Sequence, residues 1–254
     1  MTLLSVERIK LFSTRSPWWC FALALSLTIG FAALLSLSAN DTAQVNIISS
    51  QFGFNFGLAV ILVLAALAIT TEYRFNTIKT TFQAVPNRTS ALLAKAVVVA
   101  IACGIAGEIA AFGSLGISKL FRPDADLALN TAADWRAVAG AGLVTAFAAI
   151  IALSVGILVR HTAGAVSILL AYSLMVESLV RIIPKVGMDI HAWMPFNVAS
   201  RFLTGNPDVS PELADSGPGA SNSTLDPWWA MAYFAGFAVV MLTIAIVTAK
   251  KRDA

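Results

Sequence analysis

Six long apolar runs constrain this chain more than any other feature of its sequence. Each run approaches or exceeds the about 20 residues that an α-helix needs to cross the hydrocarbon core of a bilayer. The runs lie at residues 18–38, 53–71, 91–115, 138–159, 163–183 and 227–249. Strands of a membrane barrel would alternate apolar and polar residues over about ten positions, and the sequence has no such alternation. The pattern predicts an all-α membrane protein with six transmembrane helices.

The composition supports this prediction and excludes other classes of protein. Hydrophobic residues make up 58% of the 254 residues, charged residues only 12%, and the mean hydropathy is +0.80. An ordinary soluble domain has roughly 25% charged residues. A disordered chain or a coiled coil is excluded by the same composition. Cys20 and Cys103 both lie within apolar runs, so they are expected to be buried free thiols.

The Lys and Arg residues predict the orientation of the helices. With the N-terminus inside, the inner segments hold eleven of the 17 basic residues, whereas nine of the 14 acidic residues lie in outer segments. Because basic residues near helix ends resist translocation, both termini are predicted to be cytoplasmic and the protein to lie in the cell membrane. The net charge of +3 is therefore a topology signal, and nucleic acid is not an expected partner.

The sequence is expected to form a single transmembrane domain. Residues 1–17 form a cytoplasmic lead-in, 18–183 contain five spans, 184–226 form an outer segment, 227–249 form the sixth span and 250–254 form a cytoplasmic tail. The first run has about 21 residues, which exceeds the apolar core of a signal peptide, roughly 7–15 residues. An uncleaved first span is therefore expected.

Catalytic motifs are missing from the sequence. It contains no G-x-x-x-x-G-K-[ST] loop, no strand followed by G-x-G-x-x-G, no H-E-x-x-H and no G-x-S-x-G. The chain is therefore not expected to be an enzyme that hydrolyses ATP by itself. His161 and His191 are its only histidines and fall on opposite sides of the predicted membrane, so no metal site is expected.

The inner segment from Glu72 to Ser90 carries the most information. Phe75, Ile78 and Phe82 recur at helical spacing, which predicts a short amphipathic helix on the cytoplasmic face that ends at Pro86, with Thr89 or Ser90 capping the next helix. This helix either lies on the membrane surface or docks another protein. Glu72 lies at the C-terminal end of a helix, where the helix dipole disfavours a negative charge. A basic group is expected to compensate, either Arg74, Arg88 or a residue of a partner.

This segment is similar to one in a known family. It contains, in order, Glu-Tyr-Arg at 72–74, Thr-Ile at 77–78, Thr-Thr-Phe at 80–82, Pro-Asn-Arg at 86–88 and Ala-Lys at 94–95. The order resembles the segment after the second helix in type 2 permeases of ATP-binding cassette (ABC) transporters, the exporter-like family. The lead-in, with Glu-Arg-Ile-Lys-Leu, Ser-Thr-Arg-Ser-Pro and Trp-Trp, also resembles that of such permeases, and the resemblance extends over all six spans.

The resemblance implies a coupling helix that docks into a groove of a cytoplasmic ABC ATPase. The residues expected to bind the ATPase are Glu72, Tyr73, Arg74, Thr77, Ile78, Thr81, Phe82, Pro86 and Arg88. Residues 2–13 would form an interfacial elbow helix, although their apolar side chains do not gather on one face. The segment 191–203 would form a re-entrant piece before the last helix. No cofactor is expected in this chain, because the ATPase would bind the ATP and Mg²⁺.

Two acidic residues lie within predicted spans and are candidates for the transport path. Glu108 and Glu177 would each cost at least about 2–3 kcal/mol if charged and exposed to lipid, so each should face protein or water. Arg181 follows Glu177 at i+4, which favours an ion pair within the helix, whereas Glu108 has no cation at i±3 or i±4. Glycines at 53 and 57 and at 104 and 107 indicate close helix contacts, either within the chain or in a dimer.

The leading functional hypothesis is therefore the permease subunit of an ABC transporter. It would move an amphiphilic drug, lipid or peptide out of the cell, together with a second, identical or different permease subunit in the lipid membrane. One alternative is an ion- or proton-coupled secondary transporter that uses Glu108. The other is a membrane sensor or assembly factor with a soluble partner.

Overall fold

The computed structural model describes residues 3–39, 41, 44–85, 87–205 and 221–252. Six of its helical segments are long and apolar enough to cross a membrane, which confirms the predicted number of spans. The first four spans are α2 (Arg15–Ser38), α4 (Phe54–Arg74) with the preceding short α3 (Ile47–Ser50), α6 (Arg88–Phe121) and α7 (Ala132–Val159). The fifth consists of α8 (Thr162–Ala171), η2 (Tyr172–Val176) and α9 (Glu177–Val180), and the sixth is α13 (Pro227–Arg252).

Several spans begin before the apolar run does, because capping side chains set their start. Thr131 and Asp134 form a capping box in which each side chain accepts the other residue's backbone N–H, so α7 begins at Ala132 rather than at 138. Asn87 caps α6, where Thr89 or Ser90 was expected; its side chain accepts the Thr89 N–H at 3.2 Å. Hydropathy alone does not locate such ends.

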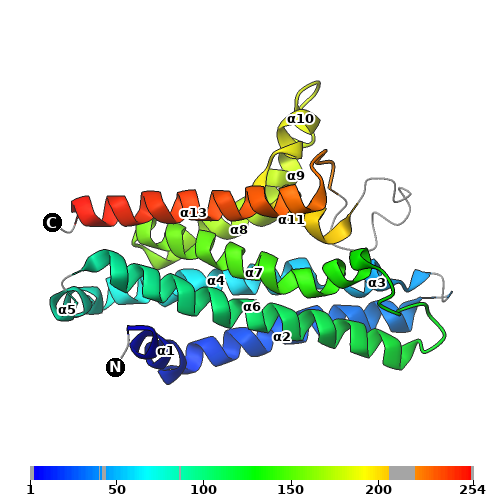
Figure 1. The fold of residues 1–254 in the computed structure, drawn as a ribbon, viewed down its shortest axis with the longest axis horizontal. Coiled ribbons are helices and arrows are strands. Elements are labelled where there is room, and N and C mark those ends of the chain that lie inside the picture. Colours follow the sequence, from blue (N-terminus) through cyan, green and yellow to red (C-terminus); the bar gives the residue numbers. More distant parts are fainter. Residues whose placement is uncertain (1–2, 40, 42–43, 86, 206–220, 253–254) are drawn as a thin grey trace.

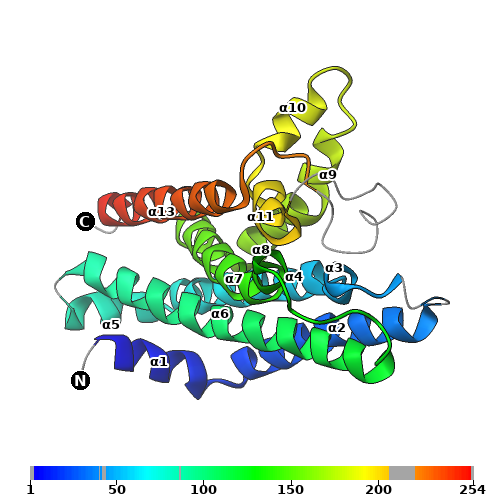
Figure 2. The same cartoon turned by 45° about the vertical axis from the view of Figure 1, so that its right-hand side comes forward.

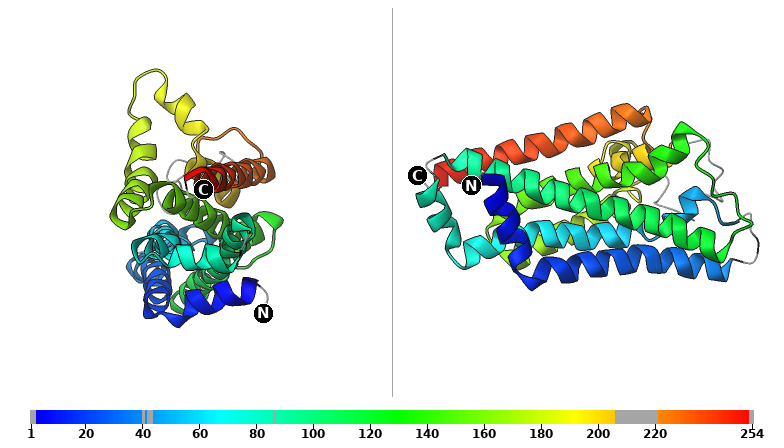
Figure 3. Two further views of the ribbon diagram at one scale, coloured as in Figure 1. Left: turned by 90° about the vertical axis from the view of Figure 1, so that its left-hand side faces the viewer. Right: turned by 60° about the horizontal axis from the view of Figure 1, so that its bottom comes forward.

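The spans form an elongated bundle with both termini at one end (Figure 1). We call this the termini end. It also holds two short helices, α1 (Leu3–Ser13) and α5 (Thr77–Ala84), as the right-hand view of Figure 3 shows. In the half of the bundle away from the termini, α9 and α10 (Gly187–Ala192) extend sideways out of it (Figure 2). The amphipathic α11 (Pro195–Thr204) lies in that half too and packs against α7 and α13.

The two central helices are α4 and α7. In each, 61% of the most apolar stretch is buried within the protein, against 22% for α2 and 17% for the fifth span. The peripheral spans expose large apolar side chains such as Leu34, Ile101, Ile105 and Val240. Lipid is the expected solvent for these faces.

The glycines found in the sequence lie at helix contacts within this chain. A Cβ atom on Gly57 would lie 2.0 Å from the Thr28 hydroxyl, and one on Gly53 would lie 2.5 Å from the Thr28 carbonyl oxygen. Gly107 approaches Thr145 of α7 in the same way, at 2.3 Å. These glycines let α4 pack on α2 and α6 on α7. They therefore give no support to a dimer, which rests on the family resemblance alone.

Candidate functional site

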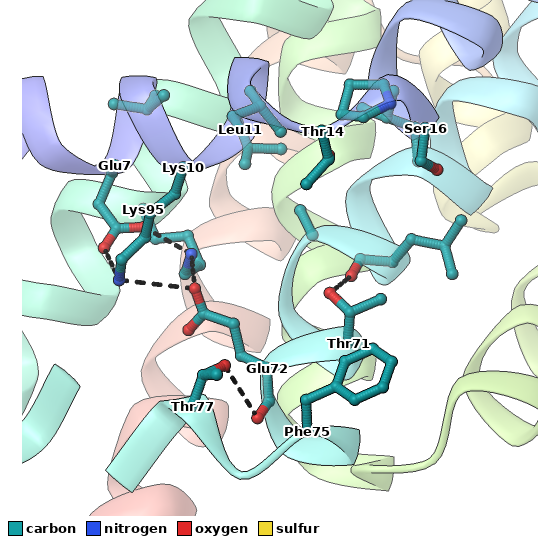
Figure 4. A pocket seen from close by; sticks show the side chains of 16 residues that line it. Glu7, Lys10, Leu11, Thr14, Ser16, Thr71, Glu72, Phe75, Thr77 and Lys95 are labelled. Atoms are coloured by element: carbon teal, nitrogen blue, oxygen red, sulfur yellow. Dashed lines mark hydrogen bonds and ion pairs between the residues drawn. The ribbon is translucent and has the colours of Figure 1, made fainter. Parts of the chain in front are cut away.

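Four charged side chains from three helices meet at the termini end (Figure 4). Lys95 of α6 donates to Glu7 of α1 at 2.5 Å and to Glu72 of α4 at 2.9 Å. Lys10 of α1 donates to Glu7 at 2.7 Å and lies 3.5 Å from the same Glu72 oxygen. We call these four residues the charge cluster. It has two positive and two negative charges, so it ties α1, α4 and α6 together without a net charge.

The charge cluster is largely shielded from solvent. The exposed fractions of the side chains are 5% for Glu7, 7% for Lys95 and 12% for Glu72, against 34% for Lys10. Burial by itself would raise the pKa of Glu7, but Lys95 and Lys10 outweigh it and hold that pKa below its ordinary value. Burial likewise opposes ionisation of Lys10, yet the two glutamates raise its pKa above the ordinary value. Glu7 and Lys10 are therefore ionised at neutral pH.

The cluster also provides the basic groups that compensate the charge of Glu72. This carboxylate lies in the last turn of α4, where the helix dipole disfavours it. Its cations are Lys10 and Lys95, and not Arg74 or Arg88 as the sequence led us to expect. The Arg74 guanidinium lies 5.5 Å from the centre of the Phe75 ring, and Arg88 lies 5.5 Å from the Phe82 ring. No partner protein is needed to neutralise Glu72.

The cluster reaches α5 through two hydrogen bonds, one of which runs from the Thr77 hydroxyl to the Glu72 backbone carbonyl oxygen at 3.4 Å (Figure 4). Besides its two acidic partners, Lys10 donates to the Thr81 hydroxyl at 3.0 Å. Asn76 has a left-handed backbone (φ 58°), which separates α4 from α5 and lets the chain turn sharply. As a result, α5 begins at Thr77, later than the predicted amphipathic pattern, and Phe75 lies outside it and is exposed.

The residues expected to bind an ATPase divide into inward and outward sets. Ile78 is buried and Phe82 packs against the core, which fixes α5 to the bundle. Tyr73 is half-buried, and the Arg160 guanidinium lies 5.0 Å from the centre of the Tyr73 ring. Arg74 and Thr77 are exposed, together with Lys79, Thr80 and Gln83, which the sequence analysis did not select. Pro86 lies outside the described residues.

A cavity of about 320 Å³ opens beside the charge cluster (Figure 4). Glu7, Lys10, Glu72 and Lys95 line one part of it. Apolar side chains of α4 and α6 line another part: Leu64, Leu67, Ala68, Val98 and Val99. One oxygen of Glu72, Oε2, is buried without a hydrogen-bond partner among the described residues. The cavity therefore joins an apolar wall to the charge cluster.

Glu177 has a different role from the one its sequence spacing predicted. Its two carboxylate oxygens accept the backbone N–H groups of Phe196 at 3.0 Å and Asn197 at 2.8 Å, in the first turn of α11. Within the described part of the chain, no ion pair joins it to Arg181. A carboxylate at a helix N-terminus satisfies donors that the helix itself leaves free. Glu177 thus fastens α11 to the fifth span.

Polar side chains continue from Glu177 into the outer segment. Asn197 donates to the His191 carbonyl oxygen at 2.7 Å and to Asn222 Oδ1 at 2.9 Å, and His191 Nδ1 lies 2.6 Å from the same oxygen. Burial lowers the pKa of His191, so its neutral form, donating from Nδ1, is the one present at neutral pH. Glu177, His191 and Asn197, together with Asn55 of α4, line a cavity of about 220 Å³ between α4, the fifth span and α11.

Glu108 lies between α6 and α7, away from both cavities. It packs against Gly142, where an added Cβ atom would meet its side chain at 2.4 Å. Its Oε2 atom is buried without a partner among the residues that the structure describes. The structure therefore does not bring Glu108 and Glu177, the two candidate path residues, together in one site.

Three members of the charge cluster were not among the residues selected from the sequence: Glu7, Lys10 and Lys95. The sequence does indicate one of them. Lys95 is an isolated charge one to two turns inside an apolar run, and a buried ammonium group needs an acidic or polar partner. Neither the family models nor the curated proteins searched contain a match to this chain. The assignment of function therefore rests on the site itself and on the resemblance described above.

Proposed function

We propose that this chain is the transmembrane permease subunit of an ABC transporter that exports an amphiphilic substrate. In this proposal α5 is the coupling helix and α1 the elbow helix. A separate cytoplasmic ATPase, docked on the exposed face of α5, binds ATP and Mg²⁺ and supplies the energy. The termini end would then face the cytoplasm, in agreement with its basic residues, and a second permease subunit would complete the path.

The observation that carries the proposal is the connection from α5 into the bundle. Lys10 contacts α5 through Thr81, α1 through Glu7 and α4 through Glu72, and Lys95 extends the connection to α6. A force on α5 would reach three helices through this one group of contacts. ATP-driven closure of the ATPase pair would thereby tilt α4 and α6 together and exchange inward-open and outward-open states.

The surface of α5 suits docking by another protein. Its apolar residues Ile78 and Phe82 are turned to the bundle, so the exposed face is polar: Lys79, Thr80 and Gln83. A helix whose only task was to lie in the membrane surface would place its apolar residues in the lipid. At the other end of α4, the polar cavity with Asn55 and Glu177 offers a place where a substrate could contact the permease.

Photo-crosslinking in native cells tests the proposal. A photoreactive residue at Lys79, Thr80 or Gln83 should capture a protein that contains nucleotide-binding Walker motifs, identified by mass spectrometry. The matched control is Ile190, which is exposed in α10 at the opposite end and should capture no such protein. If the chain is a sensor or assembly factor, the α5 positions should instead capture a protein without these motifs. That outcome would reject the ABC transporter proposal.

The ion-coupled secondary transporter remains the second candidate because of Glu108. Its Oε2 atom, buried without a hydrogen-bond partner among the described residues, belongs to the kind of group that forms proton relays in membrane proteins. Substrate uptake or release by liposomes that contain this chain alone, driven by a proton gradient and lost in Glu108→Gln, would favour that function over the ABC permease.

A further inference from the structure

We propose that the cavity of about 220 Å³ between α4, the fifth span and α11 binds an anionic amphiphile, with its phosphate or carboxylate group on Arg181 and the start of its alkyl chain along α4. This inference deepens the proposed function, because it names the class of substrate. Only the step from binding to transport rests on that function, and the binding itself can be measured without an ATPase.

A ligand can reach the polar rim of this cavity. Asn55 of α4 and Ser178 and Arg181 at the end of the fifth span line the cavity, and all three are exposed. Leu174 also lines it and is 48% exposed. Lipid tails cannot form hydrogen bonds with an exposed amide such as that of Asn55. The rim therefore requires water or a polar ligand.

The lining changes from polar to apolar in the same direction along both helices. On α4, Asn55 lies near the start of the helix, and Leu58, Ala59 and Leu62 follow one to two turns deeper. On the fifth span, Leu174 lies about two turns deeper than Arg181. A polar head joined to an alkyl chain matches this order. Because the volume is below the about 300–1,000 Å³ of sites that enclose a drug-sized ligand, the cavity admits the head group and only the first part of the chain.

The free charge in the lining is the guanidinium of Arg181. No ion pair joins Arg181 to an acidic residue within the described part of the chain. A guanidinium group presents its N–H donors in a planar fork that fits the two oxygens of a phosphate or carboxylate group. The Asn55 amide and the Ser178 hydroxyl provide further donors on the same rim.

The acidic residue of the lining does not favour a cation to the same degree. Glu177 already accepts the backbone N–H groups of Phe196 and Asn197 with its two carboxylate oxygens. These donors lie in the first turn of α11, where the positive end of the helix dipole offsets the charge of the carboxylate. The cavity thus combines a compensated acid with an uncompensated base, and this difference favours an anion.

Native mass spectrometry of the whole protein in dodecyl maltoside tests the binding. The protein is titrated with dodecyl phosphate or with dodecanol, which has the same chain and lacks the anionic group. The wild-type protein should bind one dodecyl phosphate at least about tenfold more tightly than dodecanol, because only the anion forms charge-assisted hydrogen bonds with Arg181. Equal binding of the two compounds would overturn the proposal.

Two variants separate Arg181 from the general surface charge. Arg181→Gln changes an exposed side chain and should lower the affinity for dodecyl phosphate about tenfold, to the level of dodecanol. Lys185→Gln is the matched control, because Lys185 is an exposed cation four residues later that does not line the cavity. It should leave the affinity unchanged, and an equal loss in both variants would overturn the proposal.

A further variant tests the position of the alkyl chain. Ala59→Phe places a large side chain in the apolar part of the cavity and leaves the rim in place, so it should abolish binding of dodecyl phosphate. Ala22→Phe, at an exposed position of α2, is the matched control and should retain it. Unchanged binding in Ala59→Phe would contradict the proposed site.

ATP hydrolysis distinguishes a substrate from a resident lipid. In the complex with its ATPase, reconstituted in phosphatidylcholine nanodiscs, dodecyl phosphate should raise the rate of hydrolysis in the wild type but not in Arg181→Gln. An unchanged rate despite binding would overturn the role as substrate and assign the site to a resident anionic lipid. A complex without any ATP hydrolysis would instead contradict the proposed function, and the binding result would stand.

Discussion

Replacement of Lys95 by Met should destabilise the protein strongly, because it leaves two buried carboxylates with one shared cation. Methionine keeps most of the side-chain volume, so the effect reports charge and not packing. Breaking a buried ion pair typically costs about 3–5 kcal/mol. Lys10 still contacts both acids, but a contact with a cation that is 34% exposed offsets only about 0–1 kcal/mol. The expected loss in the free energy of unfolding is therefore about 2–5 kcal/mol.

Cys103 provides the assay for this prediction. Its exposed fraction is 0%, so a thiol-reactive dye labels it only when the bundle opens, and a Cys20→Ser background removes the other, partly exposed thiol. In a temperature ramp in detergent, Lys95→Met should unfold roughly 4–20 °C below the parent protein. Lys119→Met is the matched control, because Lys119 lies in the same helix but is exposed; it should change stability by less than about 0.5 kcal/mol.

A double variant separates the ion cluster from other causes. Glu7→Gln added to Lys95→Met removes one of the two acids that then share Lys10, and should restore at least about 1 kcal/mol relative to the sum of the single effects. The reasoning would be refuted if Lys95→Met unfolded at the same temperature as Lys119→Met, or if the two effects were additive.

Three further predictions concern the helix contacts and the outer segment. Gly57→Ala should lower the free energy of unfolding by about 1–3 kcal/mol, because its Cβ atom would lie 2.0 Å from the Thr28 hydroxyl. Gly30→Ala is the control and should be tolerated, because nothing lies within 4 Å of the Cβ atom there. Thermal unfolding measures both variants, and equal effects would contradict the α2–α4 contact. Glu177→Gln should destabilise the start of α11 by about 1 kcal/mol and speed hydrogen exchange at the Phe196 and Asn197 amides. Asp189 is exposed, so Asp189→Asn is the control and should leave exchange at these amides unchanged. Burial holds the pKa of His191 below its ordinary 6.5, so folding favours the neutral ring. Its contribution to stability is complete above pH 6.5 and is lost as the pH falls below that value. The protection of the α10 amides, taken relative to their intrinsic exchange rates, should therefore fall at pH 5 in the wild type but not in His191→Asn.

The sequence predicts the spans well because their signal is local. Twenty apolar residues suffice to identify a membrane helix, whatever lies beside it. The ends of α6 and α7 depend instead on the caps at Asn87 and Thr131, which hydropathy does not register. The helix after Glu72 is visible in the spacing of Ile78 and Phe82, but its start is set by the left-handed Asn76.

The site was harder to predict, because it depends on which helices are neighbours. The sequence offers Arg74, Arg88 or a residue of a partner as the cation for Glu72, yet its cations come from α1 and α6. Glu177 was paired with Arg181 at i+4, yet two backbone donors of α11 bind it instead. In both cases a tertiary contact with good geometry replaced the local one, and no pattern in a single sequence specifies the lateral order of six apolar helices.

The central claim is that α5 transmits work from a nucleotide-hydrolysing partner. ATP hydrolysis by the complex purified through this chain from its native membrane, reconstituted in nanodiscs, tests it most directly. Thr80→Pro breaks α5 at an exposed position outside the spans, so insertion into the membrane should be unaffected, and Thr80→Ala is the matched control. We predict that the wild-type and Thr80→Ala complexes hydrolyse ATP and that the Thr80→Pro complex does not. A wild-type preparation without ATP hydrolysis, or equal rates in Thr80→Pro, would contradict the claim.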